Sequence, residues 1–477
     1  MTGSRGIKAI LATVGVLTLA SVGQAMPAAA ALTPAVYGFG SNQWGELGNG
    51  TTTASLPPTP VAGLPGTVRQ LATGLESAAA VMSDGSLWTW GSNYYHQLGF
   101  GSSASVVSTP HQVPGLSGVT QVALSDEGNG YAVESDGSVW AWGDNTHAQL
   151  GNGTTTPSYS PVRLPILTGI TQVAAGAYYA LALKSDGTVW SWGDNSNGAL
   201  GDGTTYNESL PEPVSRLTGI TQVSSGGLES FAVRSDGTLF SWGSNGSGEL
   251  GNGTSGGFSA TPAAVPGLTG VTQVASDGWA TMAVAGTTMR VWAWGDNTCG
   301  ELGDGTTASK LSPEPIGLVG VTQVAMGQSF LLDTYSAAVR YDGTLWTWGC
   351  NAFGQLGYGA VTGAIHIPTQ VTSLAGVSQF AFGDDSNGIF HPGAYGLVVG
   401  VLPATVPDLH GDSIAQAGQA LNAAGLVFGS VSYAVDYTCT NIGTVTWQSP
   451  AAGTRVNRGA AVSVRIATAP RPPRECP

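Results

Sequence analysis

Trp192-Gly-Asp-Asn-Ser-Asn-Gly-Ala-Leu-Gly201 is one copy of the segment that decides the fold of this protein. Its pattern is an aromatic residue followed by Gly-x-Asn-x-x-x-x-Leu-Gly. The pattern occurs seven times at intervals of 50 to 54 residues, beginning at Phe39, Trp90, Trp142, Trp192, Trp242, Trp294 and Trp348. A unit of this length is too small to bury its own apolar face, so we expect the copies to pack against one another.

Each unit predicts several short β-strands. Apolar residues alternate at 170–176 and 179–184, which is the period of a strand. Ser-Asp-Gly at 185–187 indicates a hairpin turn, because its glycine can take a positive φ. Trp190 and Trp192 stand two residues apart in the next strand and so point to one face of the sheet. We interpret such tryptophans as core between units, not as a sugar-binding ladder.

The strand count predicts how the units close. The first-strand segment also occurs seven times, but the chain begins inside a unit at 36–40 and the last unit stops after its second strand. The N-terminal third strand can therefore complete the blade opened at Val377, which leaves no free sheet edge. We predict an all-β, seven-bladed β-propeller at 32–401, closed by strand exchange between the N- and C-terminal ends.

The repeats resemble the regulator of chromosome condensation repeat family. Nearly every copy matches that family's Asp-Gly-x-Val-Trp-x-Trp-Gly-x-Asn and Gly-Gln-Leu-Gly motifs, and the resemblance covers about residues 36 to 400. It implies a seven-bladed propeller closed between its termini. It does not carry over the family's nuclear nucleotide-exchange role, because this chain begins with an export signal and is acidic. The family's histidine after the first strand is also absent, with residues such as Ser77 and Ala280 in its place.

The period ends near residue 402, where a second module begins. Val406-Pro-Asp-Leu-His-Gly411 leads into an expected helix with Ser413 near its start and Gly425 at its end, and alternating strands follow. Together with Gln448-Ser-Pro-Ala-Ala-Gly-Thr-Arg-Val456, these motifs resemble a PASTA domain at 402–469. The resemblance implies a small α+β fold and contact with peptidoglycan, for which Arg455 and Arg458 are candidate contacts. A role as a spacer is the alternative, and 470–477 is a Pro- and Arg-rich tail.

Residues 1–31 predict a signal peptide. Arg5 and Lys8 precede an apolar run at 9–22, and a small-residue stretch ends before Leu32. The run is shorter than the ~20 residues of a spanning helix, and no later segment reaches that length. We expect a secreted, extracellular or cell-wall-associated protein without membrane insertion. A retained N-terminal anchor is the alternative.

The negative net charge of the chain indicates which classes of ligand it can bind. The chain has a formal net charge of −14, and 32–401 holds 25 acidic against 8 basic side chains. Nucleic acid and anionic membranes are therefore poor partners. We expect a monomer that binds a protein or a cell-wall ligand.

Four cysteines predict two disulfides. Their spacing lacks the C-x-x-C pattern of zinc or redox sites, and disulfides are the default in an exported protein. Cys299 and Cys350 occupy the same turn in successive repeats, whereas Cys439 and Cys476 share the C-terminal part. We predict the pairs 299–350 and 439–476.

One end of the propeller is expected to carry the functional surface. Strands alternate in direction, so the loops after each first strand and after each third strand leave from the same face. Large aromatic and acidic side chains gather in these loops, and such residues are enriched among binding anchors. Packing at blade ends is the structural alternative. The predicted binding residues are Trp44, Glu76, Tyr94, Tyr95, Tyr178, Tyr179, Glu229, Trp279, Phe330 and Phe353.

No motif predicts catalysis. The six histidines are scattered, no His-Glu-x-x-His or P-loop occurs, and Gly253-Thr-Ser-Gly-Gly257 lies in a Gly-rich loop instead of a strand-to-helix elbow. We expect no catalytic residue, metal or cofactor, and the leading hypothesis is an exported binding protein. The alternative is an inhibitor of a β-lactamase or another cell-wall-active enzyme. An exported β-lactamase-inhibitory protein of the same repeat family binds its enzyme through loops at one end.

Overall fold

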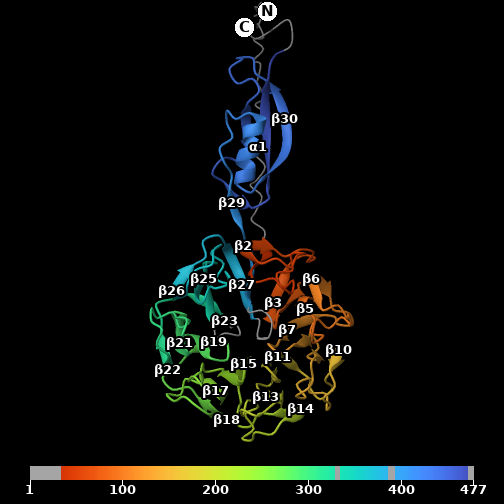
Figure 1. Cartoon of the computed structure of the whole chain (residues 1–477), viewed down its shortest axis with the longest axis vertical. Helices are drawn as coiled ribbons and strands as arrows, with labels where there is room; N and C mark the ends of the chain where they lie inside the picture. Colours follow the sequence, from red (N-terminus) through yellow and green to blue (C-terminus); the bar gives the residue numbers. More distant parts are fainter. Residues whose placement is uncertain (1–33, 328–333, 385–392, 471–477) are drawn as a thin grey trace, which may run out of the picture. The chain divides into compact units, whose positions relative to one another are not determined.

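The computed structural model describes residues 34–327, 334–384 and 393–470 (Figure 1). The chain divides into two compact units, one formed by Leu32–Pro403 and one that contains Ala404–Pro477. The described part of the first unit holds strands without a helix, and the second combines strands with one helix. The predicted signal peptide, Phe330, Cys476 and all but the first residue of the tail lie outside the described residues.

Seven four-stranded antiparallel sheets form the first unit, as the repeat predicts. The first strand of each sheet lies at the centre of the ring and the fourth at its rim (Figure 1). The six sheets of consecutive strands are β3 (Val68–Gly74), β4 (Ser77–Met82), β5 (Leu87–Ser92) and β6 (Val106–Gln112); β7 (Val119–Leu124), β8 (Asn129–Glu134), β9 (Val139–Gly143) and β10 (Ser158–Arg163); β11 (Ile170–Ala175), β12 (Tyr179–Lys184), β13 (Val189–Gly193) and β14 (Glu208–Pro213); β15 (Ile220–Ser225), β16 (Glu229–Arg234), β17 (Leu239–Ser244) and β18 (Phe258–Ala264); β19 (Val271–Ser276), β20 (Ala280–Ala285), β21 (Arg290–Gly295) and β22 (Lys310–Pro315); β23 (Val321–Gly327), β24 (Tyr335–Arg340), β25 (Leu345–Gly349) and β26 (Ile365–Gln370).

The seventh sheet joins the two ends of the propeller. Its order is β2 (Ser55–Pro60), β1 (Ala35–Gly40), β28 (Ala394–Val401) and β27 (Ala375–Asp384). β1 pairs antiparallel with β28, with Phe39 opposite Gly396. The prediction that the N-terminal strand completes the blade opened at Val377 is confirmed.

The second tryptophan of each pair lies between blades. Trp90, Trp142, Trp192, Trp242, Trp294 and Trp348 are fully buried. Each indole Nε1 donates to a carbonyl of the preceding blade; for Trp192 the acceptor is Gln149 O, at 2.8 Å. Burial of ~150–250 Å² per ring at ~25 cal/mol/Å² gives roughly 4–6 kcal/mol of gross transfer free energy. The interpretation as core is confirmed for these residues, whereas the first tryptophan of each pair is only half-buried.

A repeated glutamine links the central strands to one another. Gln172 Nε2 donates to Val223 O (2.8 Å), and Val223 N donates to Gln172 Oε1 (3.0 Å), so one side chain satisfies both backbone groups of the next blade. The closing contact is similar but joins two residues: Gln379 of β27 accepts from Leu71 N and donates to Arg69 O of β3. The sequence pattern shows this glutamine in every repeat but does not reveal its partner.

The asparagine of the repeated segment orders the long loop after the third strand. Asn195 Oδ1 accepts from Leu200 N (3.0 Å), and its Nδ2 donates to Thr204 O (3.2 Å). The equivalent contacts recur at Asn145 and Asn297. Because these bonds consume the side chain, the repeated segment is scaffold.

The second unit has the predicted α+β character. It contains β29 (Pro403–Thr405), α1 (Ile414–Ala423), β30 (Val427–Val435), β31 (Val445–Ser449), β32 (Arg455–Asn457) and β33 (Ala461–Thr468). Ser413 caps α1 in a capping box with Gln416, and Gly425 follows the helix end at φ 70°. Leu421 of α1 packs with Val462 and Val464 of β33 in the core of this unit.

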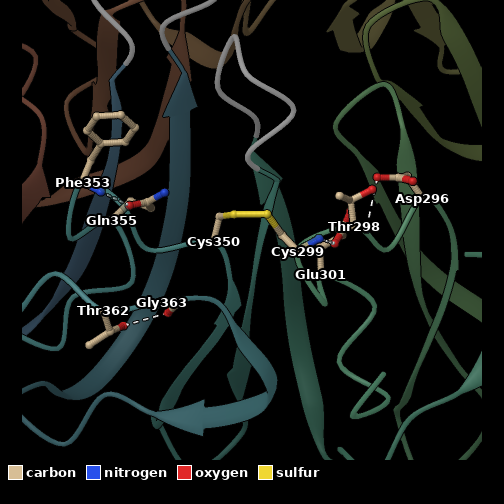
Figure 2. Close-up of a disulfide and its surroundings, with 9 residues drawn as sticks. All are labelled: Asp296, Thr298, Cys299, Glu301, Cys350, Phe353, Gln355, Thr362 and Gly363. Carbon is tan, nitrogen blue, oxygen red and sulfur yellow. Dashed lines mark hydrogen bonds between the residues drawn. A yellow bond between two sulfur atoms is a disulfide. The ribbon is translucent and has the colours of Figure 1, made fainter. Parts of the chain in front are cut away.

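One disulfide joins two neighbouring blades. Cys299 follows β21 and Cys350 follows β25; their sulfurs are bonded and their Cα atoms are 5.3 Å apart (Figure 2). The prediction of the 299–350 pair is confirmed. Cys439 is also disulfide-bonded, but Cys476 lies outside the described residues, so the 439–476 pair stays a prediction.

Candidate binding face

The loop face is the end of the propeller from which the loops after each first strand and each third strand emerge. Four of these loops meet over the three sheets from β3 to β14: the β5–β6, β7–β8, β9–β10 and β11–β12 loops. Side-chain contacts and charges connect their residues into what we call the aromatic–acidic cluster. Its members are Tyr94, Tyr95, Asp126, Glu127, Asp144, His147 and Tyr178.

Tyr178 holds three of these loops together. Its hydroxyl donates a hydrogen bond to the Glu127 carboxylate, and its ring centroid lies 4.4 Å from that of His147. Burial raises the pKa of Tyr178, and the nearby Glu127 charge raises it further. Burial also raises the pKa of Glu127, while the hydrogen bond from Tyr178 opposes that rise. The phenol therefore stays protonated and acts as the donor.

Carboxylates give the cluster its charge. Burial, followed by the Glu127 charge, raises the pKa of Asp126 to about 7. The Asp144 carboxylate accepts from Gln149 Nε2 (2.8 Å) and Thr146 Oγ1 (2.6 Å). Within the described ranges, no ion pair joins Glu127 or Asp144 to a lysine or arginine. The cluster therefore favours a cationic or hydrogen-bond-donating group on a partner.

Two adjacent tyrosines form the rim of the cluster, Tyr94 exposed and Tyr95 half-buried. Tyr95 packs on Gly128, where an added Cβ would lie 2.6 Å from Tyr95 Cβ, so a larger residue at 128 would displace the tyrosine. The rings of Tyr94 and Tyr95 meet edge to face at 5.2 Å. Tyr94 is 66% exposed. An exposed aromatic side chain beside acidic groups is typical of a protein-binding surface.

Three predicted binding residues are wrong because they are buried. The exposed fractions of Glu76, Tyr179 and Glu229 are 2%, 1% and 0%. Tyr179 and Glu229 are the first residues of β12 and β16, so their side chains enter the space between blades. Tyr179 donates to Glu229 O at 2.5 Å. The sequence pattern does not show where each loop ends, so it could not distinguish the last residue of the loop from the first residue of the following strand.

The other described residues of the predicted set are not members of the cluster. Trp279 is 39% exposed, on the β19–β20 loop. Phe353 is half-buried and packs against the core of the closing blade. Trp44 is also half-buried, and its backbone N donates to Glu46 Oε2 (2.8 Å). Phe330 lies outside the described residues. In turn, Glu127, Asp144 and His147 were missing from the predicted set, although strand parity places their loops on this face.

Buried carboxyl groups accept hydrogen bonds in the opposite half of the ring. Ser276 Oγ donates to Glu229 Oε1 (2.6 Å), and Asp277 Oδ1 accepts from Trp279 N (3.0 Å). Burial raises the pKa of Glu229 and of Glu301 to about 7, and raises that of Asp277 well above its usual range. In the described part of the chain, no group of three or more His, Cys, Asp or Glu side chains could hold a metal ion.

The candidate wall contacts lie on the second unit. Arg455 and Arg458 are both exposed. Arg458 lies over Gly425, where an added Cβ would be 2.6 Å from its Nε. Arg465 stands over the Trp447 ring, with Cζ 5.2 Å from the centroid. No described helix is long and apolar enough to cross a membrane.

Family models match both units. The regulator of chromosome condensation (RCC1) repeat matches 35–81, 84–129, 136–183, 186–233, 236–284, 290–332 and 342–389. The PASTA domain matches 404–468.

Curated relatives share part of this repeat array. The chain is 38% identical over 152 residues to the E3 ubiquitin-protein ligase HERC2 of Homo sapiens, which is 31% of this chain and 3% of that protein. It is 33% identical over 132 residues to the regulator of chromosome condensation of Xenopus laevis, 27% of this chain and 31% of that protein. The matches therefore span about a third or less of these relatives.

Solved propellers share the fold over most of the chain. Prp20p from Saccharomyces cerevisiae, whose binding properties to Gsp1p and histones have been described, superposes with a TM-score of 0.66 at 21% identity. That match covers 78% of this chain and 93% of Prp20p. Human WBSCR16 gives a TM-score of 0.66 at 24% identity over 77% of this chain and 99% of its own. At these identities the likeness shows the fold alone.

Proposed function

The chain belongs to the regulator of chromosome condensation repeat family, and from this premise we propose that it is an exported, non-catalytic binding protein. The loop face of its propeller binds a protein or cell-envelope ligand. Its PASTA domain associates with peptidoglycan. The combination of a repeat propeller with a PASTA domain supports the binding role. We propose in addition that the protein is exported, that its ligand is a protein or a cell-envelope component, and that it associates with the cell wall.

The aromatic–acidic cluster carries this proposal. Four loops from three sheets place Tyr94 and Tyr95 beside the carboxylates of Glu127 and Asp144. Glu127 lies outside the repeated segment, and Tyr94, Tyr95 and Asp144 stand at its variable positions, not at the repeated residues that build the scaffold. Tyr94 stays 66% exposed although it is large and aromatic. Exposed aromatic anchors next to unneutralised charge favour capture of a partner over internal packing.

Affinity capture with matched variants tests the loop face. Immobilised mature protein is incubated with a cell-envelope extract, and retained proteins are quantified by mass spectrometry. Tyr94→Ala combined with Tyr178→Ala is expected to reduce the specific partner at least about tenfold, the size of a hot-spot loss. Tyr341→Ala is the control, because Tyr341 is 69% exposed but lies in the β24–β25 hairpin at the other end. Equal retention by both variants would refute the loop face as the binding surface.

Sedimentation with purified sacculi tests the PASTA domain. The full mature protein is expected to pellet with the sacculi, and Arg455→Gln combined with Arg458→Gln should weaken this at least about fivefold, because carboxylate groups of the wall lose two cationic contacts. The propeller variant Tyr94→Ala should pellet normally. A wild-type protein that stays in the supernatant would leave the PASTA domain as a spacer.

The processing of the N-terminus tests export. Intact-mass measurement of the protein recovered from culture medium or cell wall is expected to show a chain that begins near residue 32. Recovery of the full-length chain from the cell interior would contradict export.

A further inference from the structure

One cavity among the described residues lies away from the loop face. It lies between the sheet of β19–β22 and the sheet of β23–β26, has a volume of about 580 Å³, and we call it the flank groove. Its apolar lining comes from Ile316, Leu318, Val319, Trp346, Ile367 and Pro368. A volume of this size lies within the roughly 300–1,000 Å³ of small-molecule sites.

A shortened connection opens the groove. In five blades, the apolar residue after the rim strand lies six positions before the first apolar residue of the next central strand, as Val265 and Val271 do. Ile316 lies only five positions before Val321. The shortened loop leaves space beside Gly317, where an added Cβ would meet no atom within 4 Å. The enlargement of the groove is thus particular to this repeat.

The equivalent crevice elsewhere in the ring shows the contrast. Between the sheets of β11–β14 and β15–β18, where the connection has its full length, the cavity is about 250 Å³. Asp202 of this crevice corresponds to Asp304 in the flank groove, but the crevice is also lined by Ser215 and Arg216 and has no aromatic side chain. In the flank groove, by comparison, Ile367 is 58% exposed and Val319 36% exposed. Water-exposed apolar side chains around a concave surface favour an apolar ligand.

A single guanidinium stands at the rim of this apolar surface. Arg340 Nε donates to Val319 O (3.0 Å), and its Nη1 lies 3.2 Å from Asp342 Oδ2. These contacts fix the plane of the guanidinium but use only part of its donor set. Trp346 Nε1 donates to Thr344 Oγ1 (3.0 Å). The polar atom of Trp346 is therefore satisfied, which leaves its ring to act as an apolar wall.

We propose that the flank groove binds a small apolar carboxylate, with its apolar part against Trp346 and Ile367 and its carboxylate on Arg340. The hydrophobic contacts supply the attraction, and the guanidinium orients the anionic end. This site is independent of the loop face, because the groove lining shares no residue with the aromatic–acidic cluster.

Titration calorimetry with 2-naphthoate tests the site, with neutral 2-naphthalenemethanol as the uncharged probe. The mature protein is expected to bind naphthoate at one site with a Kd of about 0.3 mM or lower and the alcohol at least about tenfold more weakly. Gly317→Phe should abolish binding by filling the groove, and the fold should tolerate it because the site is open and its φ is ordinary. Gly363→Phe is the matched control, since its added Cβ also meets nothing within 4 Å and it does not line the groove.

The charged contact has its own pair of variants. Arg340→Gln should weaken naphthoate binding at least about tenfold and leave the alcohol unchanged. Asp342→Asn should strengthen naphthoate binding a few-fold, because it removes the competing carboxylate while Oδ1 can still accept from Thr344 N. The proposal is overturned if wild-type protein does not bind, if Gly317→Phe binds as well as Gly363→Phe, or if naphthoate and the alcohol bind equally. Unchanged thermal unfolding of Gly317→Phe would show that its loss of binding is local.

Discussion

At the scale of single residues, two adjacent tyrosines have different roles because one ends a loop and the other begins a strand. Tyr178 ends a loop and meets Glu127 and His147 on the surface. Tyr179 begins β12 and is 1% exposed between blades. A shift of one position exchanges solvent for core, because Tyr178 lies in the loop whereas side chains on both faces of β12 are buried.

The two tryptophans of one strand allow a residue-scale prediction. Trp192→Phe is expected to lower the free energy of unfolding by roughly 2–3 kcal/mol, since it loses the bond to Gln149 O and leaves a small cavity. Trp190→Phe should cost under about 1 kcal/mol, because Trp190 is half-buried and its Nε1 has no hydrogen-bond partner among the described residues. Urea unfolding followed by tryptophan fluorescence measures both. Equal losses would mean that the interblade bond contributes nothing.

At the scale of elements, blades are held together by side chains that bond the neighbouring backbone. Central strands do not pair with one another as a sheet, so a glutamine amide supplies the donor and acceptor that a strand would otherwise provide. The disulfide between the loops after β21 and β25 adds a covalent link between two neighbouring blades (Figure 2).

The glutamine links are tested by comparing two repeats. Gln172→Leu is expected to cost roughly 1–3 kcal/mol, because Val223 N and O are left without partners. Gln222→Leu should cost less, since Gln222 Oε1 is buried without a hydrogen-bond partner in the described structure. Chemical denaturation of the two variants under identical conditions gives the difference. A larger loss for Gln222→Leu would contradict the bridging role.

The disulfide should stabilise the propeller measurably. Cys299→Ala combined with Cys350→Ala removes a link across 51 residues of sequence and should lower the free energy of unfolding by roughly 2–4 kcal/mol. Scanning calorimetry of the variant and of wild-type protein measures the change. A wild-type melting temperature that matches the variant would show that the link adds no stability.

At the scale of the whole molecule, a ring of blades closes only when its ends meet. The closing sheet takes two strands from each end of the propeller, so without either pair the blade would keep an open sheet edge. Closure also places carboxyls such as Glu229 and Glu301 in the interior, where their charged forms are costly.

These carboxyls make global stability depend on pH. The pKa of Glu229 and of Glu301 is about 7 in the folded protein, against about 4.3 for glutamate in an unfolded chain. The folded state therefore binds more protons between these values, and the free energy of unfolding should fall as pH rises from about 4.5 to about 7. Exposed aspartates whose pKa is lowered, such as Asp236, act in the opposite direction but only at more acidic pH.

Melting temperatures at pH 5 and pH 8 check this dependence. Wild-type protein should melt at a higher temperature at pH 5. Glu229→Gln should show a smaller difference between the two values, because its side chain cannot lose a proton. An identical difference in both proteins would remove Glu229 as a cause.

The sequence by itself determined the architecture. The period, the paired tryptophans and the offset between the first and last units give seven blades and their closure, because burial of a small repeating unit permits few arrangements. The helix at Ser413 and the Cys299–Cys350 bond follow from equally local signals. Only the tertiary structure decided which side chains face solvent and which loops touch. Glu127, His147 and Tyr178 come from three separate loops. Arg340 and Ile367, on two different strands of one sheet, line the same groove beside a connection that is one residue shorter than its equivalents. Such contacts depend on side-chain direction and loop path, which a repeat pattern does not encode.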